Sequence, residues 1–296
     1  MKEKSICEKF ASEHGIQLDC IIGSEIQAIY WLESSSQSYL QAASKEEERL
    51  VYEPSWGFLH LMLDRIHEHV AGSFIQYCLG FPTSGEIIAR TAIESSVNAL
   101  YVMQSKNPIE KIFEYLTSYI DQERNQNIQW KKVINHVAIE DQPIYLAALS
   151  QKAQYLDKTE EILTTLCETE LSIPYPSSKS WGNIRDRFTK VDEEMAYRTT
   201  YAAASSQVHS DAEDLLNRFL VVFSPNPDVT KTKLLIETSN FSRMIIYQGL
   251  RYYLEAMNRY CNTFSLRVPT LEAKVAQKWV DDFIVEIVKN INSILE

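Results

Sequence analysis

Glycine and proline are scarce in this sequence: its 296 residues include only 8 glycines and 9 prolines. Globular proteins usually contain about 7% glycine and about 5% proline, so this chain has few residues suited to tight turns. The scarcity argues against a sandwich or barrel of many short strands. The length is sufficient for one large domain or two modest ones.

Paired cysteines and long apolar runs are missing as well. The five cysteines are scattered, and no two have C-x-x-C spacing, which argues against a disulfide framework or a cysteine zinc site. No stretch approaches the roughly 18 apolar residues that a membrane-spanning helix requires. The first residues predict a short amphipathic helix rather than a signal peptide. We therefore expect a soluble cytoplasmic protein with no membrane partner.

Positive charge is also in short supply. The chain has 29 lysines and arginines against 40 aspartates and glutamates, a net charge of −11. Such a surface argues against general DNA binding, which requires a basic face. The sequence contains no Walker A loop, no G-x-G-x-x-G, no G-x-S-x-G and no H-E-x-x-H motif, and we expect no cofactor.

Helical periodicity is what the sequence does contain, and it predicts an all-α, multi-helix bundle. The predicted helices span 3–14, 20–48, 55–80, 84–105, 108–136, 142–171, 180–190, 192–209, 211–223, 229–263 and 271–294. Loops are predicted at 172–179 and 224–228. The predicted division is 1–50 (N-terminal helices), 51–225 (a helical core with the candidate site) and 226–296 (a hairpin of two long helices), with a single domain as the alternative.

The helix predicted at 84–105 has a polar sector. Arg90, Glu94 and Asn98 follow one another at i, i+4 and i+8, so they lie on one side of the helix. The pattern favours an ion pair that faces water, and a cleft lining is the alternative. Thr83 and Glu86 predict a capping box at its start, and Asn107 followed by Pro108 predicts the N-cap of the next helix.

A second helical segment, residues 193–215, carries tyrosines and a histidine. Tyr197, Tyr201, Ser205 and His209 recur every four residues, and Arg198 falls in the same sector. Ser210 and Glu213 predict a capping box directly afterwards, so His209 is expected at a bend with free backbone groups nearby. One interpretation is a site; the other is an ordinary amphipathic core face.

A third group, His60, Asp64 and His67, shares a helix face at i, i+4 and i+7. Imidazole and carboxylate groups suit Zn, Mn or Fe, but three ligands on one helix need a fourth from elsewhere. A hydrated polar face is the favoured interpretation, and we predict no metal. Trp181 is predicted to be a packing anchor.

Three segments together resemble a known family: ARTAIESSVNALYV, SWGNIRDRF and YRTTYAAASSQVHS. They resemble a bacterial, all-helical family of unknown function over residues 55–225, whose members are associated with phage defence. The residues that carry the resemblance are Arg90, Glu94, Trp181, Tyr197, Arg198, Tyr201, Ser205 and His209. More loosely, the arrangement resembles HEPN ribonucleases, which implies a homodimer. HEPN motifs have four to six residues between an arginine and a histidine, whereas ten residues separate Arg198 from His209 here.

Two functions follow as expectations. The first is a metal-independent ribonuclease that acts in antiphage defence, with RNA as its substrate. Its catalytic residues would be His209, Arg198, Arg90 and Glu94, and its binding residues Tyr197, Tyr201, Ser205 and Asn98. The second is a non-enzymatic helical sensor, scaffold or antitoxin-like protein that binds a protein partner and whose polar cluster is structural.

Overall fold

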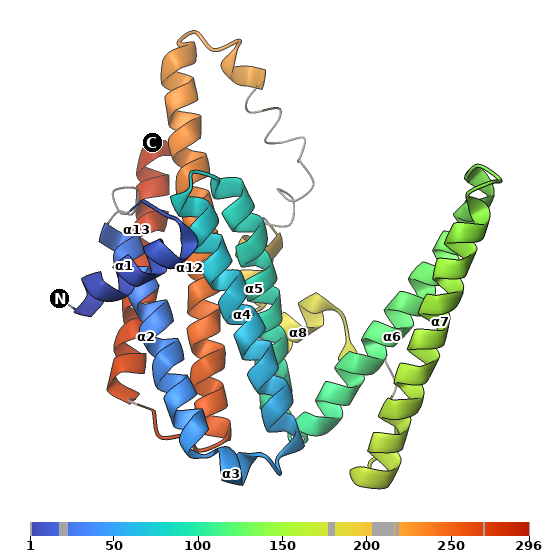
Figure 1. The fold of residues 1–296 in the computed structure, drawn as a ribbon. Coiled ribbons are helices and arrows are strands. Elements are labelled where there is room, and N and C mark those ends of the chain that lie inside the picture. The colour runs from blue at the N-terminus through green and yellow to red at the C-terminus, as the bar shows by residue number, and fades with distance from the viewer. Residues whose placement is uncertain are drawn as a thin grey trace. The chain divides into compact units, whose positions relative to one another are not determined.

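The computed structural model describes residues 2–17, 23–176, 181–202, 216, 219–268 and 270–295. Every regular element in these ranges is a helix, so the predicted all-α class is confirmed (Figure 1). The chain forms two compact units, which we call the bundle (residues 1–103 and 184–296) and the hairpin (residues 104–183). The division predicted from the sequence, at residues 50 and 225, stays a prediction.

The bundle is organised around one long helix, α12 (Pro227–Thr263), which packs against α13, α4 and α2 (Figure 1). Its other helices and turns are α1 (Lys2–His14), α2 (Gly23–Lys45), α3 (Glu47–Leu50), α4 (Pro54–Cys78), α5 (Pro82–Gln104), α8 (Ile184–Lys190), α9 (Glu194–Ala196), the π turn η5 (Tyr197–Tyr201) and α13 (Thr270–Leu295). The predicted C-terminal pair of long helices is confirmed as α12 and α13.

Buried tyrosines of α12 form much of the bundle core. Tyr247, Tyr252, Tyr253 and Tyr260 are each no more than 2% exposed. A buried hydroxyl needs a hydrogen-bond partner, and each of the four has one. The partners are Glu25 for Tyr247, Glu193 for Tyr252, Ser36 for Tyr253 and the carbonyl of Trp56 for Tyr260. These bonds connect α12 to α2, to α4 and to the segment just before α9.

A buried ion pair also joins α2 to α12. The Glu25 carboxylate is 1% exposed and accepts a hydrogen bond from Nε of Arg243 at 2.9 Å. Arg243 in turn lies over the ring of Phe283 on α13, with its guanidinium carbon 4.9 Å from the ring centroid. Because a buried charge is costly without a partner, this pair fixes how three helices of the bundle meet.

The start of α5 differs from the sequence prediction. The helix begins at Pro82, so Thr83 lies inside the first turn instead of capping it, and the predicted capping box is wrong. Glu86 is 1% exposed and accepts a hydrogen bond from Ser242 on α12 at 2.9 Å. A tertiary contact thus uses the carboxylate that the local pattern assigned to a cap.

The hairpin consists of α6 (Pro108–Val133) and α7 (Gln142–Thr165), which pack against each other. The 3₁₀ turn η2 (Ile134–His136) follows α6, and the π turn η3 (Leu166–Glu170) follows α7. Arg124 on α6 donates to Asp157 and Glu160 on α7 at 2.8 and 2.7 Å, so ion pairs as well as apolar contacts join the two helices.

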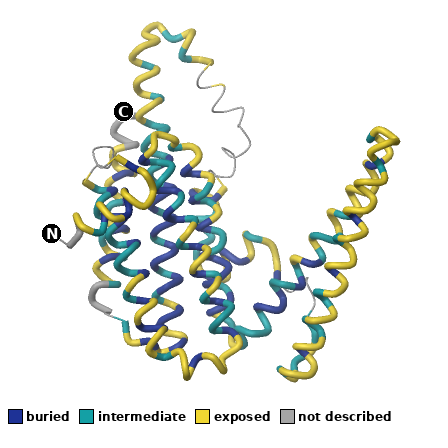
Figure 2. The backbone as a smooth tube through the Cα atoms, viewed as in Figure 1, coloured by how far each residue is buried: buried dark blue, intermediate teal, exposed yellow. Residues whose placement is uncertain are grey.

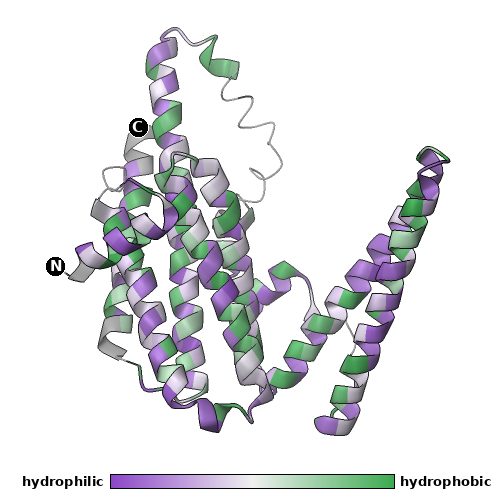
Figure 3. Cartoon of the chain, in the orientation of Figure 1, coloured by the Kyte–Doolittle hydropathy of each residue, from purple (hydrophilic) through white to green (hydrophobic). Residues whose placement is uncertain are grey.

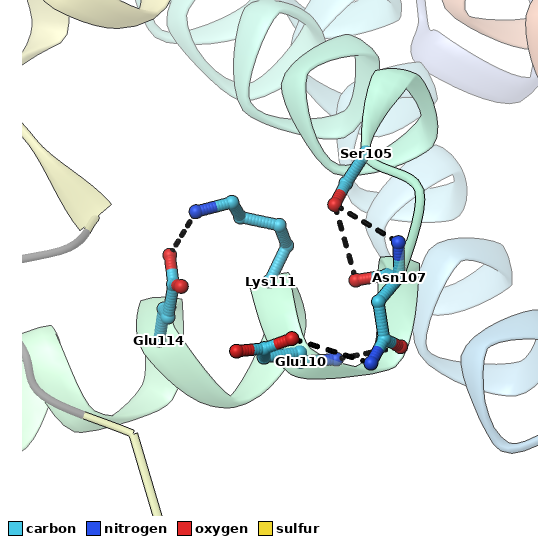
Figure 4. Close-up of polar contacts among 5 residues, drawn as sticks. All are labelled: Ser105, Asn107, Glu110, Lys111 and Glu114. Atoms are coloured by element: carbon cyan, nitrogen blue, oxygen red, sulfur yellow. Dashed lines mark hydrogen bonds and ion pairs between the residues drawn. The ribbon is translucent and has the colours of Figure 1, made fainter.

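The start of α6 confirms the predicted cap. The Asn107 side chain accepts a hydrogen bond from the backbone amide of Glu110 at 3.5 Å, and Pro108 occupies the first turn (Figure 4). The hydroxyl of Ser105 accepts from the Asn107 amide at 3.2 Å, and Lys111 pairs with Glu114 one turn along. Proline suits this position because a helix leaves its first amides unpaired.

The loop predicted at 224–228 is present: residues 222–226 are non-helical, and α12 begins at Pro227. Residues 219–221 are helical, as predicted for the end of the helix before that loop. None of the helices in the described ranges is long and apolar enough to span a membrane.

Candidate functional site

Helix α5 provides the first side chains of the candidate site. Arg90, Glu94 and Asn98 lie on one side of α5, as the spacing predicts. Asn98 is 6% exposed, whereas the Glu94 side chain is 36% exposed and Arg90 is half-buried. Instead of facing water throughout, this sector is covered by another part of the bundle.

The covering residue is Tyr201, from the π turn η5. Its hydroxyl accepts a hydrogen bond from Nη2 of Arg90 at 3.0 Å and donates one to Oε2 of Glu94 at 2.5 Å. The Arg90 guanidinium also lies over the ring, 4.8 Å from its centroid. The phenol therefore connects a guanidinium and a carboxylate that lie one helical turn apart on α5.

Arg187, on the short helix α8, completes the cluster. It is 7% exposed, donates from Nε to Oδ1 of Asn98 at 2.7 Å, and has a nitrogen 3.7 Å from a Glu94 oxygen. The Glu94 carboxylate thus contacts both Tyr201 and Arg187. We call Arg90, Glu94, Asn98, Arg187 and Tyr201 the α5 cluster.

Arg187 was not among the residues predicted for the site, although the sequence contains a signal for it. Ile184, Arg187, Phe188 and Val191 are spaced i, i+3, i+4 and i+7, which places the arginine on the apolar face of α8. An arginine on such a face is expected to be buried and to require polar or acidic partners. Asn98 and Glu94 are those partners.

Aromatic rings line one side of the cluster. Phe188 lies with its centroid 5.3 Å from that of Tyr201 and 5.6 Å from that of Tyr197. Tyr197 and Tyr201, four residues apart in the π turn, are stacked with their ring centroids 5.7 Å apart. The rings limit the access of water to the Tyr201 hydroxyl.

Burial and the adjacent Glu94 carboxylate raise the pKa of the Tyr201 phenol above its usual range. Tyr201 therefore stays protonated at neutral pH. It can donate a hydrogen bond and hold a neighbouring group in place, but it cannot supply a phenolate nucleophile.

A family model described as a family of unknown function (DUF5677) matches residues 57–227, more than half of the chain. The chain belongs to this family. No curated protein and no solved structure matches it. The resemblance to an all-helical family of unknown function, predicted over residues 55–225, is confirmed for nearly the same residues.

The DUF5677 region contains every residue of the α5 cluster. It also contains the whole hairpin, whereas α1, α2 and almost all of α12 and α13 lie outside it. Side chains of α12 nevertheless contact the matched region, as when the Arg251 guanidinium pairs with Glu193 at 2.9 Å.

The structure places the other predicted site residues differently. Arg198 is exposed and forms an ion pair with Glu194 at 3.0 Å, and Glu194 is not part of the α5 cluster. Arg185 also pairs with this carboxylate, at 3.0 Å. The hydrogen bonds from Arg185, the larger cause, and from Arg198 lower the pKa of Glu194. Ser205, His209 and the capping box predicted at Ser210 and Glu213 lie outside the residues that the structure describes.

The three side chains considered for a metal site each take part in helix contacts. His60 bonds through Nδ1 to the hydroxyl of Tyr39 on α2, and its Nε2 lies 3.6 Å from Asp64. His67 lies 3.2 Å from a carboxylate oxygen of Glu33, also on α2. Within the described ranges, no three His, Cys, Asp or Glu side chains are grouped to hold a metal ion.

Trp181 has the packing role predicted for it. It is 4% exposed, and its ring lies 4.8 Å from that of Tyr115, centroid to centroid, within the hairpin. A ring buried in this way is not available to stack on a ligand.

Proposed function

We propose that this protein is a metal-independent ribonuclease that acts in bacterial antiphage defence, with its site at the α5 cluster. The observation that carries the proposal is the state of Arg90. The hydroxyl of Tyr201 accepts a hydrogen bond from the Arg90 guanidinium and donates one to Glu94, so a half-buried cation is held in place. A guanidinium positioned in this way suits a phosphate oxygen. The defence role, the homodimer and the cytoplasmic location rest on the sequence.

The proposed reaction needs no metal or cofactor. The ribose 2′-oxygen attacks the adjacent phosphorus and the bond from phosphorus to the 5′-oxygen breaks, which leaves a 2′,3′-cyclic phosphate and a 5′-hydroxyl. His209 takes the proton of the 2′-hydroxyl or supplies one to the leaving oxygen, because imidazole titrates near neutrality. Arg90 stabilises the negative charge that develops on the phosphorane. Tyr197 and Ser205 contact the RNA.

Cleavage of RNA by the purified full-length chain tests this proposal. Total cellular RNA is incubated with the wild type and with His209→Ala, each with and without a metal chelator. We expect cleavage by the wild type in both conditions and a loss of about 10²-fold or more in the variant. Absence of cleavage, equal cleavage by the two proteins, or dependence on a metal would refute the proposal.

A second candidate is a non-enzymatic helical sensor, scaffold or antitoxin-like protein. The observation that favours it is the burial of Arg187 and Asn98 and the bond between them, since buried, paired polar groups can specify packing without chemistry. Thermal unfolding separates the two candidates. A structural cluster predicts that Arg90→Ala lowers the melting temperature clearly, whereas a catalytic cluster predicts nearly unchanged melting and lost cleavage.

A further inference from the structure

The end of the hairpin exposes an unusual amount of apolar surface. We call residues 128–149 the hairpin tip; it comprises the last turns of α6, η2, the connection and the first turns of α7. Seven large apolar side chains of the tip are between 46% and 81% exposed: Ile128, Trp130, Val133, Ile139, Ile144, Tyr145 and Leu146. Figures 2 and 3 show exposed and hydrophobic positions on these helices. Large exposed apolar side chains gathered at one end of a helical hairpin mark a candidate interaction surface.

The tip also has a hollow that could receive a side chain. Trp130, Val133, Ile134, Val137, Tyr145 and Leu149 line a space of about 260 Å³. The lining comes from both helices and η2, and it is almost entirely apolar. Ile139 is 81% exposed and lies in the connection between the helices, two residues after Val137, which lines the hollow. The tip therefore presents both an apolar recess and a protruding apolar side chain.

Charges on the tip are balanced and separated. Lys131 and Lys132 end α6, and Glu140 and Asp141 immediately precede α7. All four are exposed, and no ion pair joins them in the described hairpin. With two positive and two negative side chains the tip has a formal charge of zero, in a chain whose net charge is −11. Two copies of an acidic protein repel each other least at such a neutral surface.

We propose that the hairpin tip is a docking surface for a second copy of this chain. A two-fold pairing presents the same patch from both partners. It buries the apolar side chains of both tips, seats Ile139 of each copy against the hollow of the other, and places the lysine pair of one opposite the acidic pair of the other. Each tip therefore has both the apolar recess and the protruding side chain, and both the positive and the negative pair, that a two-fold contact requires.

Sedimentation of the full-length protein tests the surface. We expect the wild type to be a dimer at micromolar concentration and the Val133→Glu, Ile144→Glu double variant to be a monomer with unchanged helical circular dichroism. The matched control is Ile162→Glu, which alters a side chain of α7 that is 51% exposed but outside the tip, and it should remain dimeric. A monomeric wild type, or a double variant that is still a dimer, would overturn the proposal.

Charge reversal tests the arrangement. Lys131→Glu with Lys132→Glu makes the tip wholly negative, and Glu140→Lys with Asp141→Lys makes it wholly positive, so each variant alone should be a monomer. Mixing the two should restore a dimer that contains one copy of each. Failure of the mixture to associate, or dimers of either variant alone, would contradict the proposed pairing.

Discussion

Arg187 shows how a single buried charge organises the candidate site. Arginine keeps its positive charge at every accessible pH, so its burial at 7% exposure requires partners that accept hydrogen bonds. Asn98 provides one at 2.7 Å, and Glu94 provides a carboxylate at 3.7 Å. The positions of α8 and α5 within the bundle are therefore linked through one side chain.

We expect Arg187→Ala to lower the free energy of unfolding by about 1–3 kcal/mol, because it leaves the buried oxygen of Asn98 without its donor. Arg185→Ala is the matched control: Arg185 is exposed and pairs with Glu194, so its removal should change stability by no more than about 0.5 kcal/mol. Urea denaturation of both variants measures the difference. If both variants lost the same free energy of unfolding, the contact between Arg187 and Asn98 would contribute no more than the exposed ion pair of Arg185.

Part of the cluster could be predicted at the residue scale. The i, i+4 and i+8 spacing of Arg90, Glu94 and Asn98 showed that they share a face of α5, and the site interpretation of the second segment singled out Tyr201. The role of Arg187 was missed because an arginine in a charged stretch such as IRDRF looks solvated unless its neighbours at i−3, i+1 and i+4 are considered together. Arg198 was assigned to the same sector on α-helical geometry, and the π turn alters that geometry.

At the scale of elements, α4 and α5 approach each other closely at a glycine. A Cβ atom on Gly85 would lie 2.7 Å from the backbone carbonyl oxygen of Ser73, nearer than real Cβ atoms come to any atom. The α4–α5 packing therefore depends on the absence of a side chain at position 85.

We expect Gly85→Ala to destabilise the protein by about 1–3 kcal/mol, because the new methyl group overlaps backbone that cannot move alone. Gly57→Ala on α4 is the control. Among the described residues, no atom beyond its own stretch of α4 lies within 4 Å of its Cβ position, and alanine there should stabilise the helix by about 0.4–1 kcal/mol. We expect the melting temperature to fall in Gly85→Ala and to rise in Gly57→Ala, each relative to the wild type. A Gly85→Ala variant that melts at a higher temperature than the wild type would contradict the close packing.

Helix locations were predictable from periodicity, and the departures have local causes. The predicted helices at 229–263 and 271–294 correspond to α12 and α13 within two residues at each end. The helix predicted from residue 192 is instead a short α9 followed by η5, as far as the described residues extend. Periodicity assumes one number of residues per turn, so it cannot indicate where tertiary packing selects a π turn.

At the scale of the whole molecule, composition determined the fold class correctly: little glycine and proline, much helical periodicity and an all-α chain. It could not indicate which side chains fill the core or how the buried hydroxyl groups are hydrogen-bonded. The bundle buries tyrosines rather than only aliphatic side chains, and burial raises the pKa of these phenols, as at Tyr39, Tyr201, Tyr247, Tyr252, Tyr253 and Tyr260.

These tyrosines predict an alkaline limit to stability. Their phenols keep their protons in the folded state after an unfolded chain, with a tyrosine pKa of about 10, has lost them. The stability is complete below that pKa, and it falls as the pH rises further because the unfolded state is then favoured by proton release. Urea denaturation between about pH 8 and pH 11 measures this. An unfolding free energy that is as large at the alkaline end as at pH 8 would contradict the buried-phenol account.

We propose that Arg90, positioned by Tyr201 and Glu94, stabilises the charge that would develop during RNA cleavage. The most direct measurement is the cleavage rate of Arg90→Ala beside that of Arg198→Ala, on the same RNA and with both proteins confirmed to be folded. The account predicts a fall of about 10²–10³-fold for Arg90→Ala and a rate near that of the wild type for Arg198→Ala, whose guanidinium pairs with Glu194. Equal rates for the two variants would contradict it.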